Sequence, residues 1–167
     1  MFKKLELPII DIDLKLLKGE VNYQNNSFIQ YRINNFPTLH KNVTSKIKFQ
    51  IKPDIIHLTE IGYPGTHPHK DTWPVALNYY VNVSGNTTHF WKPTNNVSYK
   101  RERGPTGFNI LNLTPAGTFT ANIADWYLIN ADEIHSVQVD QGSEPRLILR
   151  YVWKNYSFEE ILQSFET

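Results

Sequence analysis

The chain contains no cysteine, and this absence removes several kinds of chemistry at once. Disulfide bonds, thiolate metal sites and cysteine nucleophiles are excluded, so a metal ion would have to be bound by histidine and carboxylate side chains. The chain also lacks an apolar run of the roughly 20 residues that a membrane-spanning helix needs. Carboxylates interrupt the apolar residues near the N-terminus, which is not typical of a secretion signal. We therefore expect a cytoplasmic protein with no membrane partner.

A surplus of charge of one sign is lacking as well. Lys and Arg total 17 against 16 for Asp and Glu, which leaves a net charge of +1. Such a balance gives no overall field to attract nucleic acid, so no nucleic-acid partner is expected. A length of 167 residues is sufficient to bury one core of ordinary size, and we predict a single domain over residues 1–167.

Residues that favour β-strands are abundant, and aromatic residues alone make up 13% of the chain. Turn signals recur at a spacing typical of a sandwich or barrel, so a β-rich domain is expected. The predicted strands are residues 5–10, 55–61, 75–83, 87–91, 108–113, 117–122, 125–130, 134–139 and 146–153. Residues 11–19 are expected to form a short helix or turn, and residues 20–53 receive no assignment. Two antiparallel sheets of this kind would form a jelly roll, whose interior can hold a small ligand and a metal.

A helix is predicted at the C-terminal end of the chain, over about residues 158–165. Ser157 and Glu160 have the spacing of a capping box, in which each side chain bonds the other's backbone N–H group. The predicted fold is therefore mainly β, with a core at about residues 55–153 and a few flanking helices.

Alternation along residues 75–83 predicts which side of that strand faces the core. Val75, Leu77, Tyr79, Val81 and Val83 fall on one face, and this apolar face is expected to point inward.

The chemistry of the chain is concentrated in a short histidine-rich segment. His69 and Asp71 would project to the same side of an extended segment. Their odd numbers would place them on the inward face defined by residues 75–83, unless Pro74 shifts the alternation of side chains. His135 could supply a third ligand from the strand at 134–139. Two histidines and one carboxylate leave three positions of an octahedral ion open, as in non-haem Fe(II) oxygenases.

Two arginines, Arg146 and Arg150, interrupt the apolar strand at 146–153 and lie on one face of it. A guanidinium on a buried strand is costly unless it meets an anion, and its geometry suits a carboxylate. We interpret this pair as the binding partner of an organic acid.

The order of His69, Asp71, His135 and then Arg146 resembles that of the Fe(II)- and 2-oxoglutarate-dependent oxygenases. Residues 76–82 resemble the YYLN strand of the prolyl-hydroxylase-like branch. Residues 85–90 resemble its GGxTxF segment, with Asn in place of the second Gly. Residues 125–130 resemble the segment that precedes the distal histidine. The match covers about residues 55–153, and the fold it implies is a double-stranded β-helix, the jelly roll of this family.

The resemblance implies roles for six residues. His69, Asp71 and His135 would bind Fe(II), Arg146 and Tyr79 would bind the distal carboxylate of 2-oxoglutarate, and Arg150 would assist Arg146. The implied reaction is a hydroxylation that consumes O₂ and 2-oxoglutarate and releases succinate and CO₂. The expected substrate is a small molecule or a peptide, and the hydroxylated group is expected to be a peptidyl or free amino-acid side chain.

Other residues have weaker assignments. His67 is interpreted as a neighbour of the metal site or of the substrate, and Trp73 and Trp91 as residues at the mouth of the interior. The basic segment at residues 99–104 is more typical of a solvated loop than of a substrate contact. Two alternatives stay open: a cupin-like metal-dependent enzyme that does not use 2-oxoglutarate, and a non-catalytic jelly-roll binding module.

Overall fold

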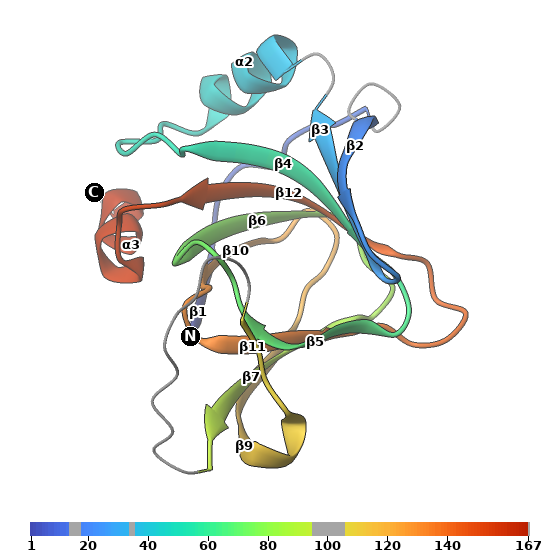
Figure 1. The fold of residues 1–167 in the computed structure, drawn as a ribbon. Helices are drawn as coiled ribbons and strands as arrows, with labels where there is room; N and C mark the ends of the chain where they lie inside the picture. Colours follow the sequence, from blue (N-terminus) through green and yellow to red (C-terminus); the bar gives the residue numbers. More distant parts are fainter. Residues whose placement is uncertain (14–17, 34–35, 95–105, 167) are drawn as a thin grey trace.

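A computed structural model of the chain describes residues 1–13, 18–33, 36–94 and 106–166. Two antiparallel sheets face each other in these residues (Figure 1). The larger sheet contains, in spatial order, β1 (Phe2–Leu5), β10 (Trp126–Asn130), β6 (Val75–Asn82), β12 (Arg146–Trp153), β4 (Ile55–Ile61), β3 (Phe28–Ile33) and β2 (Lys18–Gln24). The smaller sheet contains β8 (Thr106–Gly107), β5 (Gly65–Lys70), β11 (Ile134–Gln138), β7 (Thr87–Pro93) and β9 (Leu113–Thr120). The fold is mainly β and is a jelly roll, as the sequence predicts.

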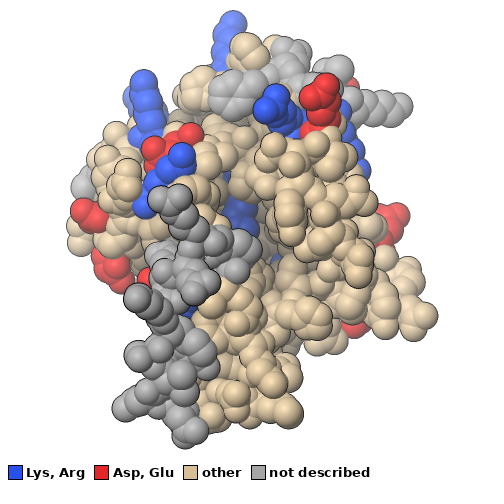
Figure 2. Space-filling view, in the orientation of Figure 1, with Lys and Arg blue, Asp and Glu red and all other residues tan. Residues whose placement is uncertain are grey.

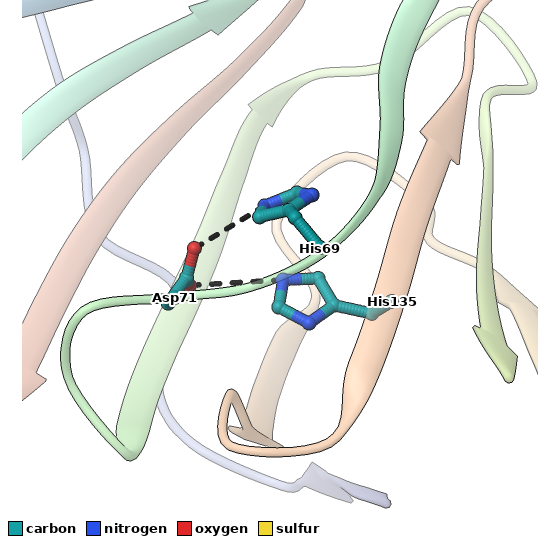
Figure 3. Close-up of side chains that lie close together, drawn as sticks. All are labelled: His69, Asp71 and His135. Carbon is teal, nitrogen blue, oxygen red and sulfur yellow. Dashed lines mark ion pairs between the residues drawn. The ribbon is translucent and has the colours of Figure 1, made fainter. Parts of the chain in front are cut away.

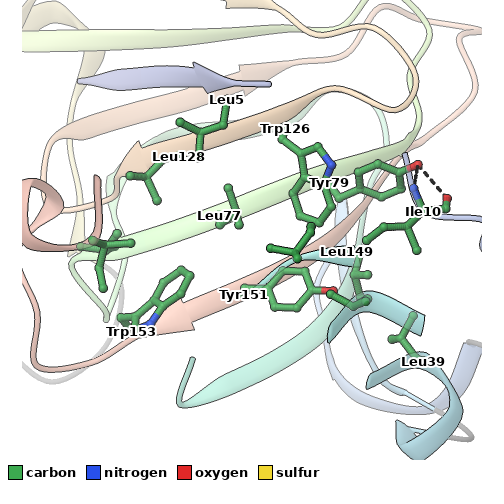
Figure 4. Close-up of a cluster of buried hydrophobic side chains, with 14 of the residues drawn as sticks. Leu5, Ile10, Leu39, Leu77, Tyr79, Trp126, Leu128, Leu149, Tyr151 and Trp153 are labelled. Carbon is green, nitrogen blue, oxygen red and sulfur yellow. Dashed lines mark hydrogen bonds between the residues drawn. The ribbon is translucent and has the colours of Figure 1, made fainter. Parts of the chain in front are cut away.

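Two helices cover the outer face of the larger sheet, on the side away from the smaller sheet (Figure 1). They are α2 (Phe36–Lys46) and α3 (Phe158–Glu166), and each contributes apolar side chains to one cluster with β6 and β12 (Figure 4). Trp126 and Trp153 are among its fully buried members. Because burial of each large apolar side chain contributes about 1.5–3 kcal/mol, this outer layer is a major part of the hydrophobic core.

A second apolar cluster lies between the two sheets and includes Tyr80, Phe90, Phe119 and Ile148. β6 and β12 are therefore buried on both faces, with alternate residues in different clusters. The odd-numbered residues of β6 pack toward the helices, while the even-numbered residues face the interior between the sheets. The predicted inward face is thus buried, but it lies on the opposite side of the sheet from the interior cavity.

Several predicted elements are confirmed, notably the strands at β4, β6, β7, β10, β11 and β12. Residues 108–113 are not a strand, because Ile110–Asn112 form a 3₁₀ turn capped by the side chain of Asn109, which accepts a hydrogen bond from the backbone of Leu111. β9 starts earlier than predicted, and β3 lies within the range that received no assignment. β2 begins at Lys18, so the end of the range predicted as a short helix or turn is a strand. The first strand ends at Leu5 rather than beginning there.

The predicted capping box opens α3. The backbone N–H of Glu160 donates to Oγ of Ser157 at 3.2 Å, and the backbone N–H of Ser157 donates to Oε2 of Glu160 at 2.7 Å. Among the residues with described positions, none belongs to a helix long and apolar enough to cross a membrane.

Candidate metal centre

Backbone pairing brings the two predicted histidine ligands together. His69 on β5 and His135 on β11 are direct cross-strand partners in the smaller sheet. Asp71 follows β5 at once, and its backbone N–H donates to the carbonyl of Ala131 at 3.0 Å, which fixes the turn before β6. The carbonyl of Pro74 accepts from the N–H of Ala131 at 2.8 Å, so both ends of this turn are held.

The three side chains converge on one point at the end of the interior (Figure 3). Nε2 of His69 lies 3.3 Å from Oδ1 of Asp71, and Nε2 of His135 lies 3.7 Å from Oδ2 of the same carboxylate. One ligand atom from each of the three residues lies within 4.8 Å of the others. The predicted triad of His69, Asp71 and His135 is therefore a compact group that could hold a metal ion.

Backbone carbonyls orient both imidazole rings. Nδ1 of His69 lies 2.7 Å from the carbonyl oxygen of His67, and Nδ1 of His135 lies 2.9 Å from that of Glu133. Since a carbonyl can only accept, each Nδ1 carries a proton, and each ring in its neutral form would present the lone pair of Nε2 to the triad. A hydrogen bond from the second ring nitrogen is typical of histidine ligands to metals.

Electrostatics keeps the carboxylate charged and one imidazole neutral. Burial alone would raise the pKa of Asp71, but Arg150 and the two histidines outweigh it and hold that pKa well below its usual value. Burial lowers the pKa of His135 to about 4. For His69 burial also acts to lower the pKa, but the carboxylate of Asp71 more than compensates and the pKa is raised. An anionic oxygen and a neutral imidazole are the protonation states that metal binding requires.

The two predicted arginines contact different groups. Arg150 donates a hydrogen bond to Oδ2 of Asp71 and so lies at the triad. Arg146 is fully buried, and its guanidinium donates to Oγ1 of Thr88 at 2.7 Å and to the carbonyl of Asn86. In the part of the chain that the structure describes, no carboxylate pairs with Arg146, and its Nε has no hydrogen-bond partner.

A narrow interior cavity of about 30 Å³ connects the triad with Arg146. Its lining includes both histidines, Arg146, Arg150, Asn78 and Tyr80. The side-chain carbonyl of Asn78 and the hydroxyl of Tyr80 are buried, and neither has a hydrogen-bond partner among the described residues. The ring of Tyr80 lies against the guanidinium of Arg146, with 5.3 Å between the ring centroid and Cζ.

The structure places Tyr79 away from this cavity. Its hydroxyl donates to the carbonyl of Ile10 at 2.8 Å and accepts from the N–H of Ile10 at 3.3 Å, on the outer side of the larger sheet (Figure 4). The predicted contact of Tyr79 with 2-oxoglutarate is therefore wrong, and its neighbour Tyr80 is the tyrosine that faces Arg146. The turn that contains Pro74 shifts the alternation of side chains between Asp71 and β6. The assumption that odd-numbered residues stay on the same side therefore selects Tyr79 in place of Tyr80.

Comparison with known proteins yields similar structures only. No protein-family model matches the chain, and no curated protein matches it. A crystal structure of vicilin from Corylus avellana (hazelnut) is 12% identical with a TM-score of 0.47, and the match covers 82% of this chain and 31% of that chain. A single-residue mutant of Bacillus subtilis oxalate decarboxylase OxdC is 13% identical with a TM-score of 0.44, covering 83% of this chain and 29% of that one. The chain thus spans less than a third of the length of these structures.

Two larger cavities open on the side of Asp71 that faces β2 and β3. One, of about 440 Å³, is lined by residues from β2, β3, β4 and β12 and by the turn after β5. The other, of about 310 Å³, lies along β5. Both include Tyr23, Phe28 and Asp71, so the two spaces meet in front of the triad.

The remaining predicted site residues divide between these cavities and other places. Trp73 lines the larger cavity and His67 the smaller one. Trp91 lines neither, because its indole N–H donates to Oγ of Ser136 at 2.9 Å and its ring packs beside a separate apolar cluster. The basic segment at residues 99–104 lies outside the described residues.

Sequence reasoning missed His57, which lines the larger cavity from β4. Its position on the strand directly opposite Arg150 is the signal that could have identified it, but that pairing joins segments about 90 residues apart and is not visible in a local pattern.

Proposed function

We propose that this chain is a metal-dependent enzyme and, more specifically, an Fe(II)- and 2-oxoglutarate-dependent dioxygenase. The observation that carries the proposal is the convergence of two imidazole Nε2 atoms and one carboxylate on a single point beside open space. The donor set of two imidazoles and one carboxylate is the one that non-haem Fe(II) oxygenases use.

The residues fit a divalent ion in both chemistry and spacing. Adjacent ligand atoms of an octahedral ion with bonds of about 2.1–2.2 Å lie about 3 Å apart. Nε2 of His69 lies 3.3 Å from Oδ1 of Asp71, which is close to this value, and one ligand atom from each of the three residues lies within 4.8 Å of the others. Binding of one ion would draw the three ligand atoms closer together, while both rings are already oriented through Nδ1.

The support for 2-oxoglutarate comes from Arg146. A buried guanidinium without a carboxylate partner is costly, and an organic dianion that reaches it from the triad would supply that partner. The free hydroxyl of Tyr80 and the free carbonyl of Asn78 face the same cavity and provide further polar contacts. One carboxylate would then meet Arg146 while the 2-oxo acid end lies at the triad.

The proposed reaction combines substrate R–H, O₂ and 2-oxoglutarate into R–OH, succinate and CO₂. One oxygen atom enters the substrate and the other enters succinate, so the two-electron oxidation of the 2-oxo acid and the two-electron oxidation of R–H together balance the four-electron reduction of O₂. Bound Fe(II) would supply the site at which O₂ and the 2-oxo acid react. The protein residues would hold the co-substrate at Arg146, keep Asp71 ionised through Arg150, and present the substrate C–H bond from the open side. We propose a peptidyl or free amino-acid side chain as the hydroxylated group.

A second candidate is a cupin-like metal-dependent enzyme that does not use 2-oxoglutarate. The cavity beside Arg146 is only about 30 Å³, and both terminal nitrogens of its guanidinium already donate to Thr88 and to the backbone of Asn86. In this candidate Arg146 holds β12 to the segment before β7, and the triad alone carries the chemistry. A non-catalytic jelly-roll module would need neither the triad nor the buried Arg146.

Release of succinate from 2-oxoglutarate, in the presence of Fe(II), ascorbate and O₂, tests the proposal. The wild-type chain should form succinate slowly even without its substrate, and His135→Ala should not. Metal binding without 2-oxoglutarate consumption would favour the second candidate. A chain that binds no divalent metal would contradict both enzymes.

A further inference from the structure

The two larger cavities meet at Asp71, and Arg146 lines neither of them but only the small interior cavity. In the proposed function the co-substrate occupies the interior, so the substrate must approach through these cavities. Figure 2 shows a hollowed face with Lys or Arg atoms at its floor, and Arg150 is the only Lys or Arg among the described residues that line the two cavities. The charges and hydrogen-bonding groups of this lining restrict what can bind there.

Acidic groups are scarce around both cavities. Among the described lining residues the only carboxylate is Asp71, and it already contacts Arg150 and both histidines. A protonated amine entering the larger cavity would meet Arg150 and, in the loaded enzyme, a divalent ion, with no additional carboxylate to neutralise it. Like charges at such short range disfavour binding in a partly desolvated site.

Neutral hydrogen-bonding groups are abundant in the larger cavity. Its lining contains Asn22, Gln30, Thr72 and His57, together with the aromatic rings of Tyr23 and Trp73. Amide and imidazole groups pair well with an uncharged amide or hydroxyl, and the rings offer apolar contact beside it.

His57 occupies a special position in this lining. It is the direct cross-strand partner of Arg150, so its ring lies next to the guanidinium that contacts Asp71. Burial and the charge of Arg150 lower the pKa of His57 to about 3, which keeps the ring neutral, with one donor and one acceptor. Its Nδ1 is buried and has no hydrogen-bond partner in the described residues.

We propose that the larger cavity binds an uncharged amide- or hydroxyl-bearing group of the substrate, that it rejects cationic groups, and that His57 is a specificity-determining residue that hydrogen-bonds this group. The inference rests on the proposed function for the statement that the bound group is a substrate. It makes His57, which lies outside the triad, responsible for substrate choice and not for metal or co-substrate binding.

The test measures binding of two probes to the full chain loaded with Zn(II), which supports no turnover. The probes are N-acetylglutaminamide and N-acetyllysinamide, which differ in a neutral or cationic end, and binding is followed by NMR titration at neutral pH. We expect the glutamine probe to shift signals of the residues around the larger cavity and to bind at least about tenfold more tightly than the lysine probe.

Variants of His57 complete the test. His57→Leu should weaken the glutamine probe about fivefold, the effect of one neutral hydrogen bond, while His57→Gln should retain binding within about twofold. His40→Leu, at an exposed position on α2, is the matched control and should change nothing. If His57→Leu does not fold, the inference is tested by the affinities of the two probes for the wild-type chain.

Equal or tighter binding of the lysine probe would overturn the inference, as would an unchanged affinity in folded His57→Leu or the absence of shifts around the cavity with either probe. None of these outcomes depends on 2-oxoglutarate. Failure of the proposed function would appear separately, as the absence of succinate formation by the wild-type chain.

Discussion

Arg150 and Asp71 form an ion pair that divides the two carboxylate oxygens between different partners. Oδ2 accepts a hydrogen bond from the guanidinium of Arg150, while Oδ1 faces Nε2 of His69 at 3.3 Å. An arginine that holds one oxygen favours metal binding through the other, and a single oxygen ligand leaves more positions of the ion open. The pair therefore connects β12, the central strand of the larger sheet, to the metal centre on the smaller one.

Removal of any triad side chain should abolish tight binding of a divalent metal. His69→Ala, Asp71→Asn and His135→Ala are each expected to weaken Mn(II) binding on the order of a hundredfold or more, because even neighbours of metal ligands contribute 10–100-fold. The affinity can be measured by calorimetry under anaerobic conditions, with circular dichroism as the check of folding. His67→Ala is the matched control, since His67 is on the same strand but exposed. Full affinity in any one triad variant would remove that residue from the metal centre.

Arg146 and Arg150 should have separable effects. Arg146→Met is expected to weaken 2-oxoglutarate binding by about 2–5 kcal/mol, because a buried carboxylate would lose its charged partner. The metal affinity of this variant should change little, since Arg146 contacts Thr88 and Asn86 and not the triad. Arg150→Met should mainly alter metal binding through Asp71. The opposite pattern, with 2-oxoglutarate binding weakened only by Arg150→Met, would reassign the co-substrate carboxylate to Arg150.

Two adjacent tyrosines provide a matched pair of variants. Tyr80→Phe should weaken 2-oxoglutarate binding about threefold to tenfold, because it deletes a hydroxyl that faces the cavity beside Arg146. Tyr79→Phe should leave that binding unchanged and cost about 1 kcal/mol of folding stability, because its hydroxyl holds the backbone of Ile10. Calorimetry and urea denaturation measure the two effects. Weaker co-substrate binding in Tyr79→Phe would show that side chains on the outer face of β6 also affect the affinity for 2-oxoglutarate.

The stability of the metal-free chain should fall in mild acid, in part through His57. Its pKa of about 3 in the folded state lies below the unfolded value of 6.5, so the unfolded chain binds the proton more readily. The contribution of His57 is present above pH 6.5 and is lost progressively as the pH falls toward 3, by about 2 kcal/mol between pH 6.5 and 4.5. His135 acts in the same direction through its pKa of about 4, whereas the raised pKa of His69 opposes the trend.

Urea denaturation of the wild-type chain and of His57→Gln, across that pH range and with a chelator present, isolates the His57 contribution. The variant should show a shallower loss of stability with acid than the wild type. Identical pH dependence in His57→Gln would mean that His57 is not held neutral by its surroundings.

The helix cap gives a prediction that is independent of the site. Ser157→Ala should destabilise the chain by about 0.5–2 kcal/mol, because the N–H of Glu160 loses its acceptor at the start of α3. Ser164→Ala, later in the same helix, is the control and should change stability by less than about 0.5 kcal/mol. Thermal or urea unfolding measures both. Equal effects of the two substitutions would argue against the cap as the source.

The elements and residues that were predictable from the sequence are those defined by local patterns. The capping box at Ser157, the alternating strand β6 and the apolar strand β12 are such cases, and so is the short spacing of His69 and Asp71. The assignment of Tyr79 failed because both faces of β6 are buried, so alternation alone does not distinguish the outer layer from the interior. His57 was missed because its position depends on a long-range strand pairing with Arg150.

The central claim is that the triad and Arg146 together form a metal-dependent site for 2-oxoglutarate. Calorimetric titration of 2-oxoglutarate into the wild-type chain, anaerobically, with and without Mn(II), tests it most directly. The account predicts one binding event per chain that requires the metal and that disappears in His135→Ala. Metal-loaded protein that binds no 2-oxoglutarate, or binding that is equally strong without metal, would contradict it.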